Sequence, residues 1–268
     1  ERVFTPDKPP TLTSEQREVW REIEMLLASD ESPPPVLLLG VTGSGKTELY
    51  LQATAEVLHA GKQALIMVPE ISLTPQTVRR FAVRFPGRVG LWHSRMTEGE
   101  RFDTWRRVRR GELSIVVGAR SALFVPFPNL GLIVMDEEED TSYKGGRQPY
   151  YHTRETAAQL ARLTGALLLM GSATPSLEAY HHALSGEYRL LRLPSRVLAH
   201  RRRVADWKRF LGLKRTRYKA LPGKNEAATI PLPPVQIIDM RAELRMGNRS
   251  IFSLGLQGAV DEALRQGE

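Results

Sequence analysis

The sequence contains no cysteine and no long apolar run. Without cysteine, its 268 residues can form neither a disulfide nor a thiolate metal site. No apolar run approaches the roughly 18 residues that a membrane-spanning helix needs, so we expect no membrane association. The first residues, from Glu1, are charged and rich in proline and do not resemble a secretory signal. These absences favour a cytoplasmic chain, and its ends suggest a piece of a longer protein.

The excess of positive charge is local. The formal net charge is +8, yet ten Lys and Arg residues and a single acid, Asp206, lie between residues 200 and 224. The rest of the chain carries 28 basic and 29 acidic residues. Trp207, Phe210 and Tyr218 lie among the charges of this stretch. The stretch therefore predicts an arm that binds nucleic acid through charge and stacking, with a solvated loop as the alternative.

Short apolar segments alternate with amphipathic ones along most of the chain. We expect a first helix that begins at Thr13 or Ser14 and ends near Ala28. Strands are expected at 36–39, 64–68, 89–92, 115–117, 132–136 and 167–170, and helices at 46–60, 74–85, 97–110, 153–164 and 175–184. Strands this apolar, separated by helices, predict an α/β fold with a mainly parallel sheet and helices on both faces.

One segment matches the phosphate-loop pattern G-x₄-G-K-[ST]: Gly40, Val41, Thr42, Gly43, Ser44, Gly45, Lys46 and Thr47. It lies between an expected strand and an expected helix, which disfavours a glycine-rich turn that matches by chance. The glycines allow backbone N–H groups to point at phosphates, at the positive end of the helix. Lys46 is expected to contact the β- and γ-phosphates of ATP, and Thr47 to bind Mg²⁺.

Two carboxylates, Asp136 and Glu137, end the strand expected at 132–136. Because parallel strands end at a common edge, this pair is expected beside the phosphate loop. Asp136 is predicted to bind Mg²⁺, and Glu137 to orient or deprotonate an attacking water. Acidic residues are common after strands, and it is their position about 90 residues after the phosphate loop that favours this function.

Further motif-like segments are Gly-Ser-Ala-Thr-Pro at 171–175 and the segments 69–76, 118–124, 136–138, 239–244 and 247–253. Taken together, these segments resemble motifs of the PriA family, the replication-restart helicases of superfamily 2. The resemblance covers residues 13 to 268 except the basic stretch. It implies a linker at 1–13, a RecA-like P-loop domain at 14–196, a basic insertion at 197–232 and a C-terminal linker segment at 233–268. That last segment would lead to a zinc module and a second motor domain.

The family resemblance also implies an activity. It predicts an ATP-dependent helicase that unwinds DNA 3′ to 5′ at abandoned forks and helps to reload the replicative helicase. The implied partners are single-stranded and forked DNA, other primosome proteins and single-strand-binding protein, and we expect a monomer associated with the nucleoid. ATP and Mg²⁺ are the expected cofactors, with zinc only in a cysteine-rich module that this chain lacks.

Further site residues follow from the motifs. Gln16 resembles a glutamine that reads adenine, with a solvated helix residue as the alternative. Residues predicted to couple nucleotide to DNA are Glu139, Ser172, Ala173 and Thr174. Residues predicted to contact DNA are Ser72, Thr74, Arg120, Ser121, Tyr143, Lys144 and Arg147. A helix cap at Ser72 or Thr74, and an ordinary solvated loop at 142–147, are the alternatives.

Three positions depart from the family pattern. Glu139 replaces a histidine, Ala119 replaces a threonine, and the loop 149–155 differs from the family's Pro-Arg-Tyr-x-Ala-Arg-Asp. Because the phosphate loop is intact, we expect ATP binding. A weakly active or inactive scaffold that binds forks and recruits replication proteins is the alternative function. A P-loop switch or kinase is disfavoured by the motif at 172–174.

Overall fold

The computed structural model describes residues 9–29, 31–70, 73, 75–146, 148, 150–199, 228–230 and 237–265. It divides into two compact units, residues 1–231 and 232–268. The basic stretch at 200–224 lies outside the described residues. So do Ser72, Thr74 and Arg147, and their predicted contacts with DNA stay predictions.

The first unit is built on a seven-stranded sheet in the order β3-β4-β2-β5-β6-β1-β7. Each pair of neighbouring strands is parallel. The strands are β1 Val36–Gly40, β2 Gln63–Met67, β3 Val89–Trp92, β4 Ile115–Gly118, β5 Leu130–Asp136, β6 Leu167–Ser172 and β7 Arg189–Leu193. The six expected strands are present within two residues at each end, and β7 adds a seventh at the edge beside β1.

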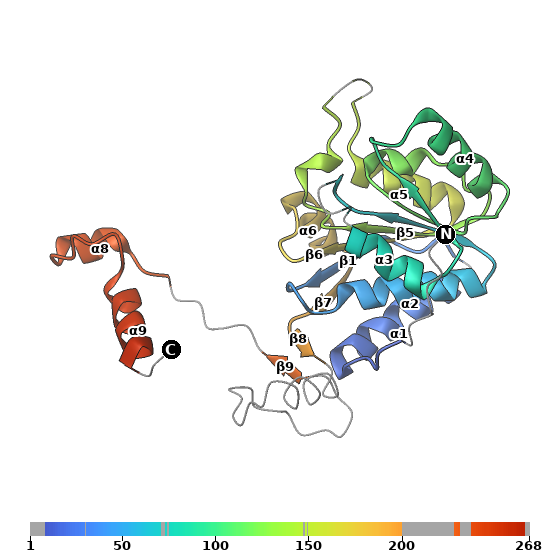
Figure 1. Cartoon of the computed structure of the whole chain (residues 1–268). Helices are drawn as coiled ribbons and strands as arrows, with labels where there is room; N and C mark the ends of the chain where they lie inside the picture. Colours follow the sequence, from blue (N-terminus) through green and yellow to red (C-terminus); the bar gives the residue numbers. More distant parts are fainter. Residues whose placement is uncertain are drawn as a thin grey trace, which may run out of the picture. The chain divides into compact units, whose positions relative to one another are not determined.

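Helices cover both faces of this sheet (Figure 1). On one face lie α1 Ser14–Ala28, α2 Lys46–His59 and α3 Pro75–Arg84; on the other lie α4 Glu98–Arg109, the 3₁₀ turn η2 Arg120–Phe124, α5 Thr153–Thr164 and α6 Leu177–Leu184. Neighbouring residues of one strand face opposite cores, so that Leu38 packs with α1 to α3 and Leu37 with the other helices. The predicted α/β fold is confirmed.

The start of α1 is set by a reciprocal cap. The Thr13 hydroxyl accepts from the Gln16 backbone N–H at 3.2 Å, and the Gln16 side chain accepts from the Thr13 N–H at 3.0 Å. This arrangement satisfies two of the N–H groups that a helix leaves unpaired at its first turn. It also buries Gln16, which is only 6% exposed.

A short antiparallel ladder joins β8 Arg196–Ala199 to β9 Ala228–Ile230. The Val197 N–H donates to the Gly43 carbonyl at 2.9 Å, and Arg196 Nε donates to the Thr42 carbonyl at 3.0 Å. The domain boundary predicted at residue 196 therefore falls at the first residue of a strand that contacts the phosphate loop.

The second unit contains α8 Met240–Arg245 and α9 Leu254–Arg265. Glu243 Oε2 accepts from Asn248 Nδ2 at 2.7 Å and from the Leu254 N–H at 2.9 Å, which fixes the turn between the two helices. In the part of the chain that the structure describes, no helix has both the length and the apolar character to cross a bilayer.

A buried ion pair connects the end of β5 to the helices behind it. The Glu138 side chain is fully buried, and Arg154 of α5 donates to its Oε2 at 3.3 Å. Ser176, the N-cap of α6, donates its N–H to Glu138 Oε1 at 2.7 Å and its hydroxyl to Oε2 at 3.0 Å. One carboxylate thus fixes β5, α5 and α6 relative to one another.

We expect Arg154→Ala to lower the free energy of unfolding by about 3–5 kcal/mol, because it leaves the buried charge of Glu138 without a cation. Denaturant titration followed by circular dichroism measures this loss. The matched control is Asp103→Ala, which removes the exposed partner of Arg106 and should cost less than about 1 kcal/mol. Similar losses in the two variants would show that the buried pair has no special weight.

Candidate nucleotide site

The phosphate loop connects β1 to α2 and depends on two glycines. Gly43 and Gly45 have φ values of 80° and 87°, in the left-handed region that side chains disfavour. A Cβ at Gly45 would also overlap the amide of Gln16. Inside the loop, the buried Ser44 hydroxyl has no hydrogen-bond partner among the described residues. An unpaired buried donor beside a helix N-terminus fits a phosphate group.

Lys46 lies where the phosphate loop meets the end of β5. Its ammonium donates to the Gly40 carbonyl at 2.6 Å. Burial lowers the pKa of Lys46 from its usual value, and the carboxylates of Asp136, Glu139 and Glu137 oppose that shift. The lysine predicted to contact phosphates and the carboxylates predicted after β5 therefore lie close enough to interact at one edge of the sheet.

Two buried tyrosines contact Asp136. The Tyr50 hydroxyl, from α2, donates to Asp136 Oδ1 at 2.9 Å, and the Tyr143 hydroxyl donates to the Asp136 carbonyl at 2.8 Å. Burial raises the pKa of Asp136, while the Tyr50 hydrogen bond and the charge of Lys46 oppose that rise. Burial also raises the pKa of Tyr50 well above its usual value, so its hydroxyl stays protonated and remains a donor.

Strand β6 separates β1 from β5, and Gly171 near its end has a steric role. In register, Gly171 pairs with Asp136 on one side and with Leu38 on the other. A Cβ at Gly171 would overlap the Tyr50 hydroxyl. Glycine at this position therefore lets Tyr50 pass over β6 to reach Asp136.

Glu137 has an unusual backbone conformation. Its φ of 51° is the only positive value among the described residues other than glycine. The Asp140 N–H donates to the Glu137 carbonyl at 2.9 Å and closes the turn. Such conformations are costly and persist where the surroundings impose them. Here the partly buried Asp136 and the buried Glu138 fix the backbone on both sides and leave Glu137 exposed.

The predicted coupling residues meet beside this turn. The Thr174 hydroxyl donates to Glu139 Oε1 at 3.2 Å, and the Thr174 N–H donates to the Ser172 hydroxyl at 2.9 Å. Glu139 Oε2 is buried and accepts no hydrogen bond from the described residues. Ala173 lies between these residues at the end of β6. The segment after β5 and the segment after β6 are therefore in direct contact.

The sequence profile of the DEAD/DEAH box helicase family matches residues 13–182. The chain belongs to this family. It is 44% identical over all 268 residues to replication restart protein PriA of Bacillus subtilis (strain 168), and 43% identical over 94% of its length to PriA of Synechocystis. The chain spans 29% and 27% of the lengths of these two curated relatives. The predicted resemblance to PriA is confirmed.

A comparison with a solved structure supports the fold. The chain superposes on the structure of RecG bound to a three-way DNA junction with a TM-score of 0.52 and 26% sequence identity. The superposition covers 76% of this chain and 28% of that one. This superposition agrees with the predicted RecA-like fold.

The structure contradicts the predicted role of one site residue. Tyr143 was predicted to stack on DNA bases, but its ring is fully buried in the core under α5 and its hydroxyl is bonded to Asp136. The prediction of a stacking role is wrong, because a ring packed on all sides offers no face to a base. Its neighbour Lys144 is exposed, and its predicted contact with DNA stays a prediction.

Arg120 supports the same loop. Its Nη1 donates to the Ser142 carbonyl at 3.2 Å and to the Lys144 carbonyl at 2.5 Å, and its guanidinium lies 5.7 Å from the centre of the Tyr151 ring. These contacts give Arg120 a structural role that the sequence did not indicate. Ser121 beside it is exposed, and contacts of both residues with DNA stay predictions.

Gln16 already uses much of its hydrogen-bonding capacity within the chain. Besides capping α1, it donates from Nε2 to the Ser44 carbonyl at 2.8 Å. The bond ties the first turn of α1 to the phosphate loop. Its predicted contact with adenine stays a prediction, and the structure adds a role in holding the loop.

The residues present fit Mg²⁺. The Thr47 hydroxyl and the Asp136 carboxylate are oxygen donors, and Mg²⁺ typically takes one or two protein ligands and completes its shell with phosphate oxygens and water. The predicted role of these two residues as ligands of Mg²⁺ stays a prediction.

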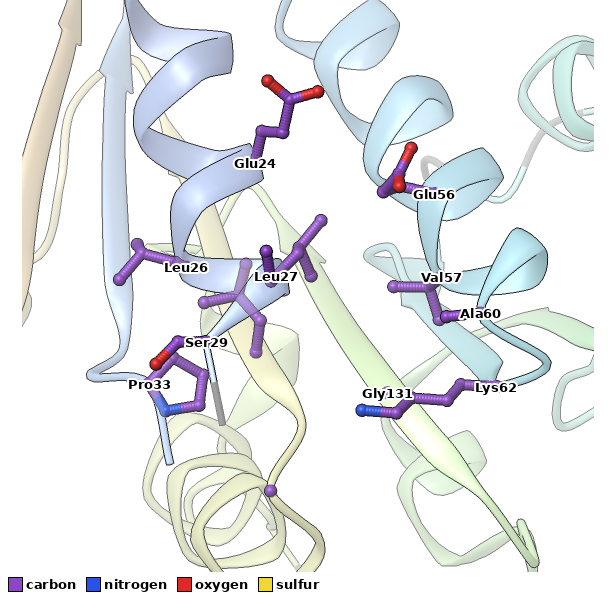
Figure 2. A pocket seen from close by; sticks show the side chains of 13 residues that line it. Glu24, Leu26, Leu27, Ser29, Pro33, Glu56, Val57, Ala60, Lys62 and Gly131 are labelled. Atoms are coloured by element: carbon purple, nitrogen blue, oxygen red, sulfur yellow. The ribbon is translucent and has the colours of Figure 1, made fainter. Parts of the chain in front are cut away.

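A cavity of about 170 Å³ lies elsewhere, between the C-terminal ends of α1 and α2 (Figure 2). Leu27, Val57 and Lys62 are among the residues that line it. Because Lys62 precedes β2, the cavity lies at the edge where the strands begin. It is therefore separate from the phosphate loop, which follows β1.

We expect Lys46→Ala to weaken ATP binding about 10- to 100-fold, because it removes a charge-assisted contact with the phosphates. Titration with a fluorescent ATP analogue measures the affinity. Lys62→Ala is the control, since it removes the same charge at the opposite edge of the sheet. Equal affinity of the unaltered protein and Lys46→Ala would contradict the assignment of the site.

Proposed function

We propose that this chain is the ATP-binding motor domain of a DNA helicase that acts in replication restart. The observation that carries the proposal is the meeting of Lys46, Asp136 and the Glu139–Thr174 contact at one edge of the sheet. Helicase motors need such a junction, because nucleotide and DNA must influence each other. The similarity to PriA over the whole chain supports the biological setting.

The chain's own residues account for the first steps of hydrolysis. Lys46 and the N–H groups of the phosphate loop bind the triphosphate, while Thr47 and Asp136 hold Mg²⁺. When bound, Mg²⁺ neutralises charge on the phosphates. Glu137, exposed beside Asp136, orients the attacking water or accepts its proton. The remaining charge stabilisation comes from a second RecA-like domain, as the family resemblance implies.

DNA is proposed to bind at the same edge. The exposed Ser121 and Lys144 and the segment at 69–76 follow strands that end there. Hydrogen bonds to DNA phosphates suit a motor that moves along any sequence, because they carry no sequence information. We extend the proposal to single-stranded and forked DNA, to other primosome proteins and to single-strand-binding protein as partners, and to association with the nucleoid.

We expect the full-length protein to hydrolyse ATP faster when forked DNA is added, and residues 1–268 alone to bind ATP but hydrolyse it slowly with little stimulation. The reason is that the domain with the remaining catalytic charge is absent from the shorter chain. Phosphate release with and without forked DNA measures both. Robust DNA-stimulated turnover by residues 1–268 alone would contradict the proposed division of labour.

One observation favours a second candidate, a scaffold that binds forks and recruits replication proteins without a working motor. Glu139 adds a carboxylate close to Lys46 and Asp136, with one buried oxygen that accepts no hydrogen bond from the described residues. Negative charge there opposes the negative charge of the triphosphate. A full-length protein that binds forked DNA but shows no DNA-stimulated hydrolysis would favour the scaffold, and a gain of stimulation in Glu139→His would identify Glu139 as the cause.

A further inference from the structure

Tyr50 lies at the candidate nucleotide site but belongs to neither the phosphate-loop motif nor the helicase motifs. It lies on α2, one helical turn after Lys46, and it is 1% exposed. A tyrosine buried this deeply must give its hydroxyl a partner. The partner is the side chain of Asp136 rather than a backbone group.

The hydrogen bond between Tyr50 and Asp136 joins segments at the ends of two strands that are not neighbours. Asp136 ends β5 and the phosphate loop follows β1, with β6 between them. Because neighbouring strands lie about 4.8 Å apart, the two segments are separated by about 10 Å at the sheet edge. The tyrosine ring spans this gap, and Gly171 of β6 leaves room for it. Two separate features, a long side chain and a missing Cβ, serve one hydrogen bond.

A carboxylate that binds a metal performs best when its orientation is fixed. Groups that hydrogen-bond to metal ligands orient them and are nearly as important as the ligands themselves. Tyr50 bonds to one carboxylate oxygen of Asp136. Tyr143, from the other face of the sheet, bonds to the carbonyl of the same residue. The side chain and the main chain of Asp136 are thus held by different tyrosines.

We propose that Tyr50 is a positioning residue of the magnesium site, whose hydroxyl fixes the Asp136 carboxylate in the orientation that binds Mg²⁺. The proposal rests on the proposed function, since it takes Asp136 as a magnesium ligand. It also links the two parts of the site directly, because Tyr50 and Lys46 lie on the same helix. The helix that binds the phosphates thereby also orients the metal ligand.

The test compares Tyr50→Phe with Tyr143→Phe in the full-length protein. Each variant removes one buried hydroxyl that bonds to Asp136, but only Tyr50→Phe frees the carboxylate. Binding of a fluorescent ATP analogue is measured over a series of Mg²⁺ concentrations and in EDTA. We expect Tyr50→Phe to raise the Mg²⁺ concentration for half-maximal binding about 10-fold. Its binding in EDTA and the midpoint of Tyr143→Phe should stay within about 2-fold of the unaltered protein.

Thermal unfolding tests whether both variants are folded, and we expect that they are, since phenylalanine keeps the packed ring. An unchanged Mg²⁺ midpoint in Tyr50→Phe, or equal shifts in the two variants, would overturn the proposal, because either result reduces Tyr50 to a packing residue. Failure of the unaltered protein to bind the analogue at any Mg²⁺ concentration would overturn the proposed function itself. The two failures are therefore distinguishable.

Discussion

The partly buried carboxylate of Asp136 is the constraint on which the site depends. Burial disfavours a charged carboxylate, so the surroundings must compensate. The compensation comes from the Tyr50 hydroxyl and the charge of Lys46, both on α2. These two interactions join the start of the phosphate-loop helix to the end of β5, in addition to the apolar packing of that helix on the sheet. A sheet that places three parallel strand ends side by side makes this possible.

The four consecutive residues from Asp136 to Glu139 connect the end of β5 to other parts of the domain. Asp136 contacts the phosphate-loop helix, Glu137 is exposed in a left-handed turn, Glu138 bonds to Ser176 and Arg154, and Glu139 accepts from the hydroxyl of Thr174. The segment that follows β5 is thus connected to two helices and to the end of β6. A change in the phosphates at Lys46 has a short covalent and hydrogen-bonded route to the Ser-Ala-Thr segment. The coupling of nucleotide to DNA that we propose would act through this connection.

Much of the fold was predictable because its signals are local. Apolar runs predicted the strands, the cap at Thr13 predicted the start of α1, and the glycine pattern predicted the phosphate loop. The residues whose roles we predicted wrongly or missed depend on contacts between distant segments. Tyr143 has basic neighbours in sequence and suggested an exposed loop, yet it packs in the core. Tyr50 carries no local signal, because its importance arises only when β6 brings Gly171 beneath it.

The placement of charge bears on the proposed binding of DNA by this domain. Outside residues 200–224, basic and acidic residues nearly cancel, with 28 against 29. Non-specific affinity for DNA grows with the number of phosphates that cations neutralise. Of the basic residues predicted to contact DNA, Arg120 is already bonded to the loop that it supports. The DNA contacts that we propose for the described residues are therefore a few oriented donors at one edge of the sheet, and the ten basic residues at 200–224 lie outside the described part of the chain. The proposed motor would have to release and rebind DNA in each cycle. A few such donors would suit it, since each contact can be made and broken by a small movement of one segment.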